Sequence, residues 1–249
     1  MKLKRRTRKD IPKRRRRVKS SIFRIARFVF LYIPLLLFIL SLCYTVILKW
    51  APVPYTPLMA IRAKEYKGDD NFETIKKWTP LENISADMVM AVIASEDNRF
   101  DDHKGFDWVE IDNAIEERRS GKRIRGASTI SQQTAKNVFL YPSRSWVRKG
   151  LESYFTVAIE LIWGKERIME VYLNVAEMGK GVYGAEAAAN VSFGKTAQKL
   201  TGTESALIAA TLPDPLKRSA KVPSPYVRSR AADIERLMTK IKRPEWIEK

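Results

Sequence analysis

An uncharged run of twenty-one residues, from Phe28 to Leu48, directly follows a strongly basic segment. A helix of that length covers the hydrocarbon core of a bilayer, so the run predicts a transmembrane span over 28–48. The following Lys49–Pro52 lacks the small-residue pattern of a cleavage site, which favours a retained anchor over a secretory signal. A buried core helix is the alternative reading, and the adjoining cations weigh against it.

The basic residues are concentrated ahead of this span. Residues 1–27 hold fourteen Lys or Arg against the single acid Asp10, so most of the formal charge of +18 lies there. Basic segments stay on the cytoplasmic side, so everything after the span is expected outside. A basic tail could bind nucleic acid, but the domain behind it is only mildly basic, and we expect no nucleic-acid partner.

Single residues exclude two kinds of site. Cys43 is the only cysteine and lies inside the predicted span, so an intrachain disulfide and a cysteine metal cluster are excluded. His103 is the only histidine, which excludes a His-rich metal site.

The domain organisation follows from these boundaries. We assign 1–27 to a cytoplasmic tail, 28–48 to the anchor, 49–80 to a linker and juxtamembrane segment that leads to a first short helix, and 81–249 to the working domain. Helical periodicity dominates that domain. Core-facing stripes are expected at Leu151, Tyr154, Phe155, Ala158, Ile159 and Ile162, at Ile168, Val171, Tyr172 and Val175, and in a last helix within 226–249. The fold class is mainly α.

Glu96 and Asp97 end the apolar run that begins at Met88. A carboxylate at the edge of a core is desolvated, which raises its pKa and makes a usable general base. An isolated acidic pair more often ends a helix and faces solvent. The pair therefore proves nothing by itself.

The segment from Gly126 to Asn137 predicts a turn followed by a helix start. Thr129 and Gln132 have the spacing of a capping box. The helix would carry many hydrogen-bonding groups on one face, suited to an anionic or sugar ligand, although such faces are more often only solvated. The candidate binding residues are Ser128, Thr129, Gln133, Lys136 and Asn137.

Arg148, Lys149 and Glu152 lie at i, i+1 and i+4 of a predicted helix. The two cations could hold a diphosphate, while Glu152 coordinates a divalent cation or positions a reacting group. As a solvated ion-pair face the same three residues would be unremarkable. Two separated carboxylates and a diphosphate clamp together suggest glycosyl transfer.

Five segments in this order resemble the peptidoglycan glycosyltransferase family, which includes monofunctional biosynthetic transglycosylases and the N-terminal domains of bifunctional penicillin-binding proteins. The resemblance spans about Met88 to Pro215. Its segments are Glu96–Asp107, Gly126–Leu140, Arg148–Glu152, Arg167–Lys195 and Glu204–Pro213. The chain departs from the commoner pattern at Ala127, where a second glycine is frequent, and at Asn113, where many bifunctional members carry arginine.

The resemblance implies a lysozyme-like, two-lobed helical domain that polymerises lipid II into glycan strands with inversion at the anomeric carbon. Glu96 would deprotonate the acceptor 4-hydroxyl. Arg148 and Lys149 would neutralise the departing undecaprenyl diphosphate. Glu152 would be a second catalytic residue or would hold Mg²⁺ or Mn²⁺ with that diphosphate, and no organic cofactor is implied.

The implied partners are lipid II, the growing glycan strand, the membrane, and cell-division or elongation proteins. The implied location is the bacterial cytoplasmic (inner) membrane, with one span, the N-terminus inside and the catalytic domain on the periplasmic face. These expectations agree with the charge pattern around the span.

Other functional classes share some of these sequence features. A wall-cleaving lysozyme-like hydrolase would use carboxylates in a helical cleft but would need no diphosphate clamp. A non-enzymatic scaffold would leave Glu96 and Glu152 as surface groups. A transpeptidase is excluded, because the Ser192–Lys195 match lacks companion motifs and little chain follows Pro215.

Overall fold

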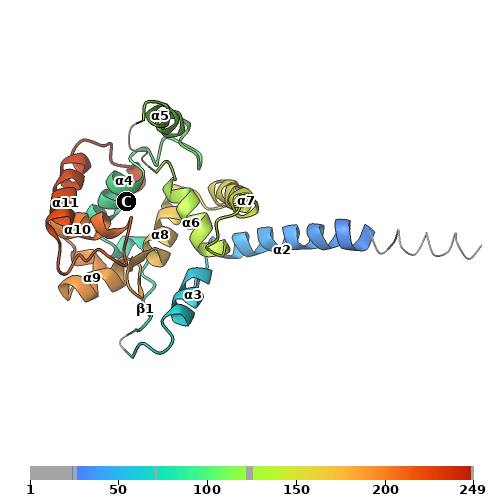
Figure 1. Ribbon diagram of the computed structural model, residues 1–249, viewed down its shortest axis with the longest axis horizontal. Coiled ribbons are helices and arrows are strands. Elements are labelled where there is room, and N and C mark those ends of the chain that lie inside the picture. The colour runs from blue at the N-terminus through green and yellow to red at the C-terminus, as the bar shows by residue number, and fades with distance from the viewer. Residues whose placement is uncertain (1–23, 25–26, 71, 122–125, 248–249) are drawn as a thin grey trace, which may run out of the picture. The chain divides into compact units, whose positions relative to one another are not determined.

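The computed structural model describes residue 24 and residues 27–70, 72–121 and 126–247 (Figure 1). The predicted basic tail lies almost entirely outside the described residues. The chain divides after Ile47 into two compact units, which are described here one at a time.

The first unit contains the predicted span. A π-helical turn η1 (Phe28–Tyr32) runs into helix α2 (Ile33–Ile47), giving twenty consecutive apolar helical residues. Within the described ranges this is the one helix long and apolar enough to cross a membrane, and only 6% of its most apolar window is buried. A core helix of a soluble protein would be mostly buried, so the segment is consistent with a single-pass anchor.

The second unit, from Leu48 onward, is mainly helical, as expected. Its α-helices are α3 (Pro57–Glu65), α4 (Ala86–Glu96), α5 (Trp108–Arg119), α6 (Ile130–Phe139), α7 (Trp146–Ile162), α8 (Lys165–Val175), α9 (Ala185–Phe193), α10 (Gly202–Thr211) and α11 (Pro225–Met238). Short 3₁₀ turns lie at η2 (Leu81–Asn83), η3 (Ala197–Lys199) and η4 (Glu245–Ile247).

Local sequence sets where most of these helices begin. Side-chain oxygens accept hydrogen bonds from first-turn amides at the N-caps Thr56, Ser85, Asp107, Thr129, Ser145, Thr201 and Ser224. Each cap satisfies an amide that has no partner inside its helix. The capping boxes predicted at Thr129–Gln132 and Thr201–Glu204 are both confirmed.

A small sheet, which the sequence did not predict, joins the first and later parts of this unit. Its order is β1 (Ile75–Lys76), β3 (Val182–Tyr183), β2 (Glu177–Gly179), with β1 parallel and β2 antiparallel to β3. Strands of two or three residues are too short to show an alternation of apolar and polar residues, so the sequence pattern did not predict them. β1 and α3 lie within the segment expected to be a linker, and Val53 and Met59 there are fully buried.

The main core surrounds α8, which contacts α6, α7 and α9. Its predicted stripe Ile168, Val171, Tyr172 and Val175 is buried, as expected. On α7 the prediction holds for Ala158 and Ile159 but is wrong for Leu151, which is 45% exposed. Neighbouring residues on a helix point about 100° apart, and here Glu152 faces inward while Leu151 faces solvent.

A second cluster packs α10 against α4 and α11 (Figure 1). Its core is rich in alanines, from α4 (Ala91, Ala94), α10 (Ala206, Ala209, Ala210) and α11 (Ala231). Small side chains allow close approach of helices. The predicted last helix is confirmed as α11. It packs directly on α4, the helix that ends at Glu96.

Candidate active site

Glu96 is the last residue of α4, where the buried helix emerges from the core. Its side chain is half-buried. Oε2 accepts a hydrogen bond from Gln133 Nε2 at 3.0 Å, and Oε1 accepts one from Ser95 Oγ at 3.2 Å. The carboxylate is therefore oriented from two sides, while part of it stays accessible to a ligand.

Gln133 is itself oriented from behind. Its Oε1 accepts a hydrogen bond from the hydroxyl of Tyr172 at 3.3 Å, which fixes the amide so that its NH₂ group faces Glu96. Burial raises the pKa of Tyr172 well above its usual value, with the charges of Glu96 and Asp97 acting in the same direction. Tyr172 therefore keeps its proton. Helical periodicity predicted Tyr172 in the core but not its contact with Gln133, because only the tertiary structure brings α8 to α6.

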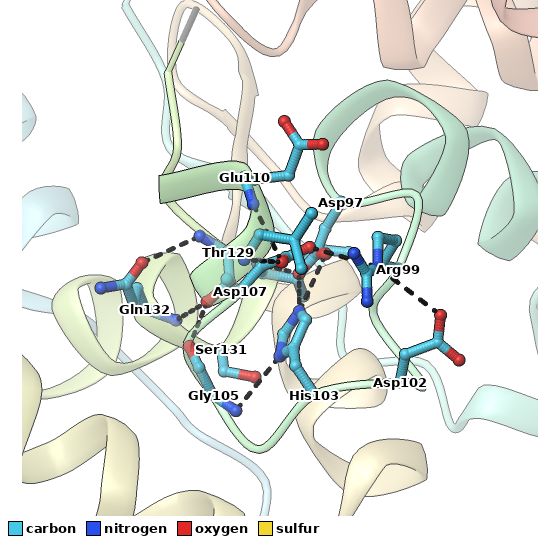
Figure 2. A network of polar contacts seen from close by, with 12 residues as sticks. Asp97, Arg99, Asp102, His103, Gly105, Asp107, Glu110, Thr129, Ser131 and Gln132 are labelled. Atoms are coloured by element: carbon cyan, nitrogen blue, oxygen red, sulfur yellow. Dashed lines mark hydrogen bonds and ion pairs between the residues drawn. The ribbon is translucent and has the colours of Figure 1, made fainter. Parts of the chain in front are cut away.

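Asp97 joins the end of α4 to the start of α6 (Figure 2). Its buried carboxylate accepts a hydrogen bond from the backbone amide of Ile130 at 3.0 Å. The same carboxylate lies 3.0 and 3.1 Å from His103 Nε2. His103 Nδ1 accepts from the Gly105 amide at 3.2 Å, so the proton of the neutral ring lies on Nε2 and is donated to Asp97. This network sets the position of α6, and so of Gln133, relative to Glu96.

Asp97, His103 and Asp107 could hold a metal ion, because one ligand atom from each lies within 4.8 Å of the others. No sequence pattern predicted this mixed group, because its three residues do not have the spacing of a His-rich or cysteine site. A histidine bound to metal through Nε2 would carry its proton on Nδ1 and donate it to an acceptor. Here a backbone donor, the Gly105 amide, faces Nδ1, so the present hydrogen bonds fit Asp97 better than a metal as the partner of Nε2.

The predicted binding residues in and just before α6 differ in how far they are buried. Thr129 is buried, accepts from the Gln132 amide and donates to the Gly105 carbonyl at 2.7 Å, so its hydroxyl is used within the protein. Ser128 is exposed, whereas Lys136 and Asn137 are half-buried. Ser128, Lys136 and Asn137 are therefore better placed than Thr129 to meet a ligand through their side chains.

The predicted cationic patch on α7 is present. The two oxygens of the buried Glu152 pair with Arg148 Nη1 and Lys149 Nζ. Burial acts to raise the pKa of Glu152, but Lys149 and Arg148 outweigh it and hold that pKa below the usual value. Glu152 is therefore a carboxylate that orients two cations and is not a proton donor near neutral pH.

Lys136 connects the two ends of the site. Burial lowers the pKa of Lys136, and the positive charges of Arg148 and Lys149 lower it further. The negative charges of Glu152 and Glu96 act in the opposite direction. Glu96 and the α7 patch therefore act on one shared cation, Lys136. Within the described residues, Arg148 Nε is a buried atom without a hydrogen-bond partner, which leaves it available to an anion.

A cavity of about 410 Å³ opens beside this patch. It is lined by Lys136, Asn137 and Arg148 from the predicted site, and by Leu58, Arg62, Leu140, Pro142, Ser143 and Arg144. Its lining thus combines four cations with an apolar side. Arg62 and Leu58 come from α3, in the segment expected to be a linker, so no sequence pattern predicted them at this cavity.

The two departures from the commoner family pattern lie together. Asn113 and Ala127 line a second cavity of about 340 Å³, along with Glu110, Ala114, Glu116, Glu117, Ser120 and Gly126. Its polar lining is acidic, in contrast to the cationic cavity beside α7.

Comparison with known proteins gives a consistent result. The sequence model of a family described as "Transglycosylase" matches residues 65–239. A biosynthetic peptidoglycan transglycosylase of Bacteroides thetaiotaomicron is 50% identical over 231 residues, covering 92% of each chain. Proteins with the same name from Caulobacter vibrioides and Bdellovibrio bacteriovorus are 50% and 51% identical, covering 80% and 79% of this chain and 84% and 79% of their own.

Proposed function

The chain belongs to the transglycosylase family, and on that premise we propose that it polymerises lipid-linked disaccharides into the glycan strands of peptidoglycan. The class of enzyme, a peptidoglycan glycosyltransferase with a lysozyme-like helical domain, follows from the family and from relatives that share half of its residues. The assignment of individual residues is our proposal. The observation that carries it is the single site formed by Glu96, α6 and the cations of α7.

Glu96 acts as the general base in this proposal. It takes the proton of the 4-hydroxyl of the acceptor sugar as that oxygen attacks the anomeric carbon of the growing chain. The bond from that carbon to the undecaprenyl diphosphate breaks, and the configuration inverts. The support is geometric, because Gln133 and Ser95 each hold one oxygen of a half-buried carboxylate at the end of α4.

Arg148, Lys149 and Lys136 receive the negative charge of the leaving diphosphate. Glu152 holds Arg148 and Lys149 in place, so they need little reorganisation when that charge develops. The free Nε of Arg148 adds a donor, and burial strengthens each of these interactions. Ser128, Thr129, Gln133 and Asn137 complete the proposed substrate-binding set, with Thr129 acting chiefly through the helix start that it caps.

A divalent cation is a secondary part of the proposal. Both oxygens of Glu152 are already paired with cations, and a Mg²⁺ site normally needs more oxygen ligands than one carboxylate supplies. Glu152 alone therefore does not form a metal site. We place a Mg²⁺ or Mn²⁺ ion, where one takes part, mainly on oxygens of the substrate diphosphate, with Glu152 as a single protein ligand.

The proposal also includes a membrane orientation and a set of partners. The proposed orientation has the N-terminus in the cytoplasm and the catalytic unit on the periplasmic face of the inner membrane, and the excess of cations ahead of the span supports it. The growing strand and lipid II are the direct partners, and cell-division or elongation proteins are the proposed recruiting partners. A wall-cleaving activity is less well supported, because hydrolysis needs no buried cationic patch beside the base.

The test is polymerisation of purified lipid II by the full-length chain in detergent, with muramidase digestion of the product. Polymer from wild type and none from Glu96→Gln is expected. Arg148→Met should also lose activity, while the exposed Arg228→Met should not. Fragments released from preformed wall without polymer would overturn the synthetic function. Addition of EDTA and then Mg²⁺ or Mn²⁺ tests the metal separately.

A further inference from the structure

The end of the chain contacts the segment that carries Glu96 at two places. α11 reaches the last turn of α4 through Arg230, and the segment after α11 reaches the following loop through Trp246. The family match ends at residue 239, so Trp246 lies beyond it. Neither contact follows from the proposed reaction, and both need an explanation.

The first contact lies directly behind Glu96. Arg230 Nη2 donates to Ser95 Oγ at 3.3 Å and approaches the Ser95 carbonyl at 3.5 Å. Carbonyls in the last turn of a helix have no partner inside the helix, and a cation there is favourable. Ser95 Oγ in turn donates to Glu96 Oε1 at 3.2 Å, or alternatively to the Ala209 carbonyl at 3.3 Å. Accepting from Arg230 uses a lone pair of the hydroxyl and leaves its proton to donate, and the charged carboxylate of Glu96 is the stronger of the two acceptors.

This arrangement complements the contact from α6. Gln133 holds Oε2 of Glu96, and the pair Ser95 and Arg230 holds Oε1. The two oxygens are thus fixed from opposite parts of the fold, one from the side of the cationic patch and one from the C-terminal helix. Loss of either support would let the carboxylate rotate, and small misplacements of a reacting group are costly.

The second contact fixes the loop just after Glu96. Trp246 Nε1 donates to Asp101 Oδ1 at 3.0 Å, and its ring meets the fully buried Phe100 edge to face, with centroids 6.4 Å apart. Lys165 Nζ covers another side of the Phe100 ring, 4.4 Å from its centroid. Phe100 also closes the turn that starts at Asp97, through a backbone bond of 3.0 Å. Trp246 therefore holds the turn that carries Asp97.

We propose that the C-terminal segment 225–247 is a positioning element for the general base, with Arg230 acting through Ser95 on Glu96 and Trp246 acting through Phe100 and Asp101 on the Asp97 turn. The inference rests on the proposed role of Glu96. It assigns Arg230, Ser95 and Trp246 no contact with substrate. Their loss should therefore lower kcat and leave KM for lipid II nearly unchanged.

The experiment measures kcat and KM for lipid II with the full-length chain in detergent. Arg230→Met should lower kcat about tenfold to a hundredfold, as expected for misplacement of a reacting group, with KM within about twofold. Arg230→Lys keeps a cation and should recover most of the rate. The matched control is Arg228→Met, because Arg228 is an exposed arginine on the same helix that donates to the Pro223 carbonyl.

Two further variants separate the route from a general loss of folding. Ser95→Ala should lower kcat as Arg230→Met does, and the double variant should be no worse than the more damaging single one, because both act on one chain of hydrogen bonds. Trp246→Phe keeps the ring but loses the Nε1 donor, so its kcat should fall less than that of Trp246→Ala. Glu245→Gln is the exposed neighbouring control.

The outcomes distinguish the inference from the proposed function. A raised KM for Arg230→Met with unchanged kcat would make Arg230 a substrate ligand and overturn the inference. Full activity of Arg230→Met and Trp246→Ala, or strict additivity of Arg230→Met with Ser95→Ala, would overturn it as well. If Glu96→Gln itself stays active, the proposed base is wrong, whatever the other variants do.

Discussion

Replacing Asp97 with Asn tests whether the buried carboxylate network holds α4, the following loop and α6 together. The change keeps the size of the side chain but exchanges one acceptor oxygen for an NH₂ group. In the protein both partners of Asp97, the Ile130 amide and His103 Nε2, are donors. An Asn oxygen in the Oδ2 position can accept from both of them, but its NH₂ group then faces the Nε2 donor of His103 and has no acceptor there. Reversing the His103 tautomer gives no relief, since Nδ1–H would face the Gly105 amide.

The expected cost follows from this count. One buried donor without an acceptor costs about 1–3 kcal/mol, and the surviving bonds lose the part of their strength that came from charge, about 1 kcal/mol. We therefore expect Asp97→Asn to lower the free energy of unfolding by about 2–4 kcal/mol. For a unit of about 200 residues this corresponds to a melting temperature lower by roughly 4–16 °C.

The assay is thermal unfolding of the full-length chain in detergent, followed by circular dichroism. Asp102→Asn is the matched control, because Asp102 lies in the same loop with its side chain 65% exposed and only a 3.8 Å ion pair to Arg99. Its melting temperature should shift by less than the equivalent of about 0.5 kcal/mol. Equal melting temperatures for the two variants would refute the reasoning, because the buried network would then contribute nothing.

Three other substitutions test separate parts of the structure. The pKa of Glu152 is depressed in the folded protein, so its carboxylate stabilises the fold above the unfolded pKa. That contribution is lost as pH falls through the folded pKa. Glu152→Gln should therefore flatten the acid side of a plot of melting temperature against pH. Lys136→Met removes a cation whose pKa burial lowers, so the melting temperature should stay equal or rise while lipid II polymerisation falls about a hundredfold or more. A fall in both would contradict this. Gly181→Ala should lower the free energy of unfolding in urea by about 2–4 kcal/mol, because φ is +72° and a Cβ would lie 2.2 Å from the Glu73 carbonyl oxygen. The control is Gly121→Ala, which is also at positive φ but in open space and should cost less.

Much of the fold was predictable because it depends on residues close together in the chain. The span over 28–48 follows from length and composition, and the structure places a twenty-residue apolar helix at Phe28–Ile47. The capping boxes and the helices that they begin depend on residues three apart. The pairing of Arg148 with Glu152 depends on residues four apart on one helix. In each case the geometry of a single helix is sufficient.

Other features depended on contacts that no local pattern records. The sheet was missed because its strands have two or three residues. Leu151 was placed in the core, but Glu152 takes the inward position and pairs with Arg148 and Lys149, which leaves Leu151 45% exposed. Arg62 reaches the cationic cavity from a segment that proline content had marked as a linker.

The sequence by itself determined the apolar span and the helical class, and it predicted the two carboxylates and the cations of the site, because composition, periodicity and ordered motifs carry that information. The tertiary structure alone decided what surrounds Glu96. Gln133 lies 37 positions away from it in the chain, and Arg230 lies 135 positions from Ser95. Tyr172 and Trp246 join the site only when α8 and the C-terminal segment pack in place. The physical reason is that a side chain's partners across the core are set by how whole helices pack, and that packing is the sum of many weak contacts spread over the entire chain.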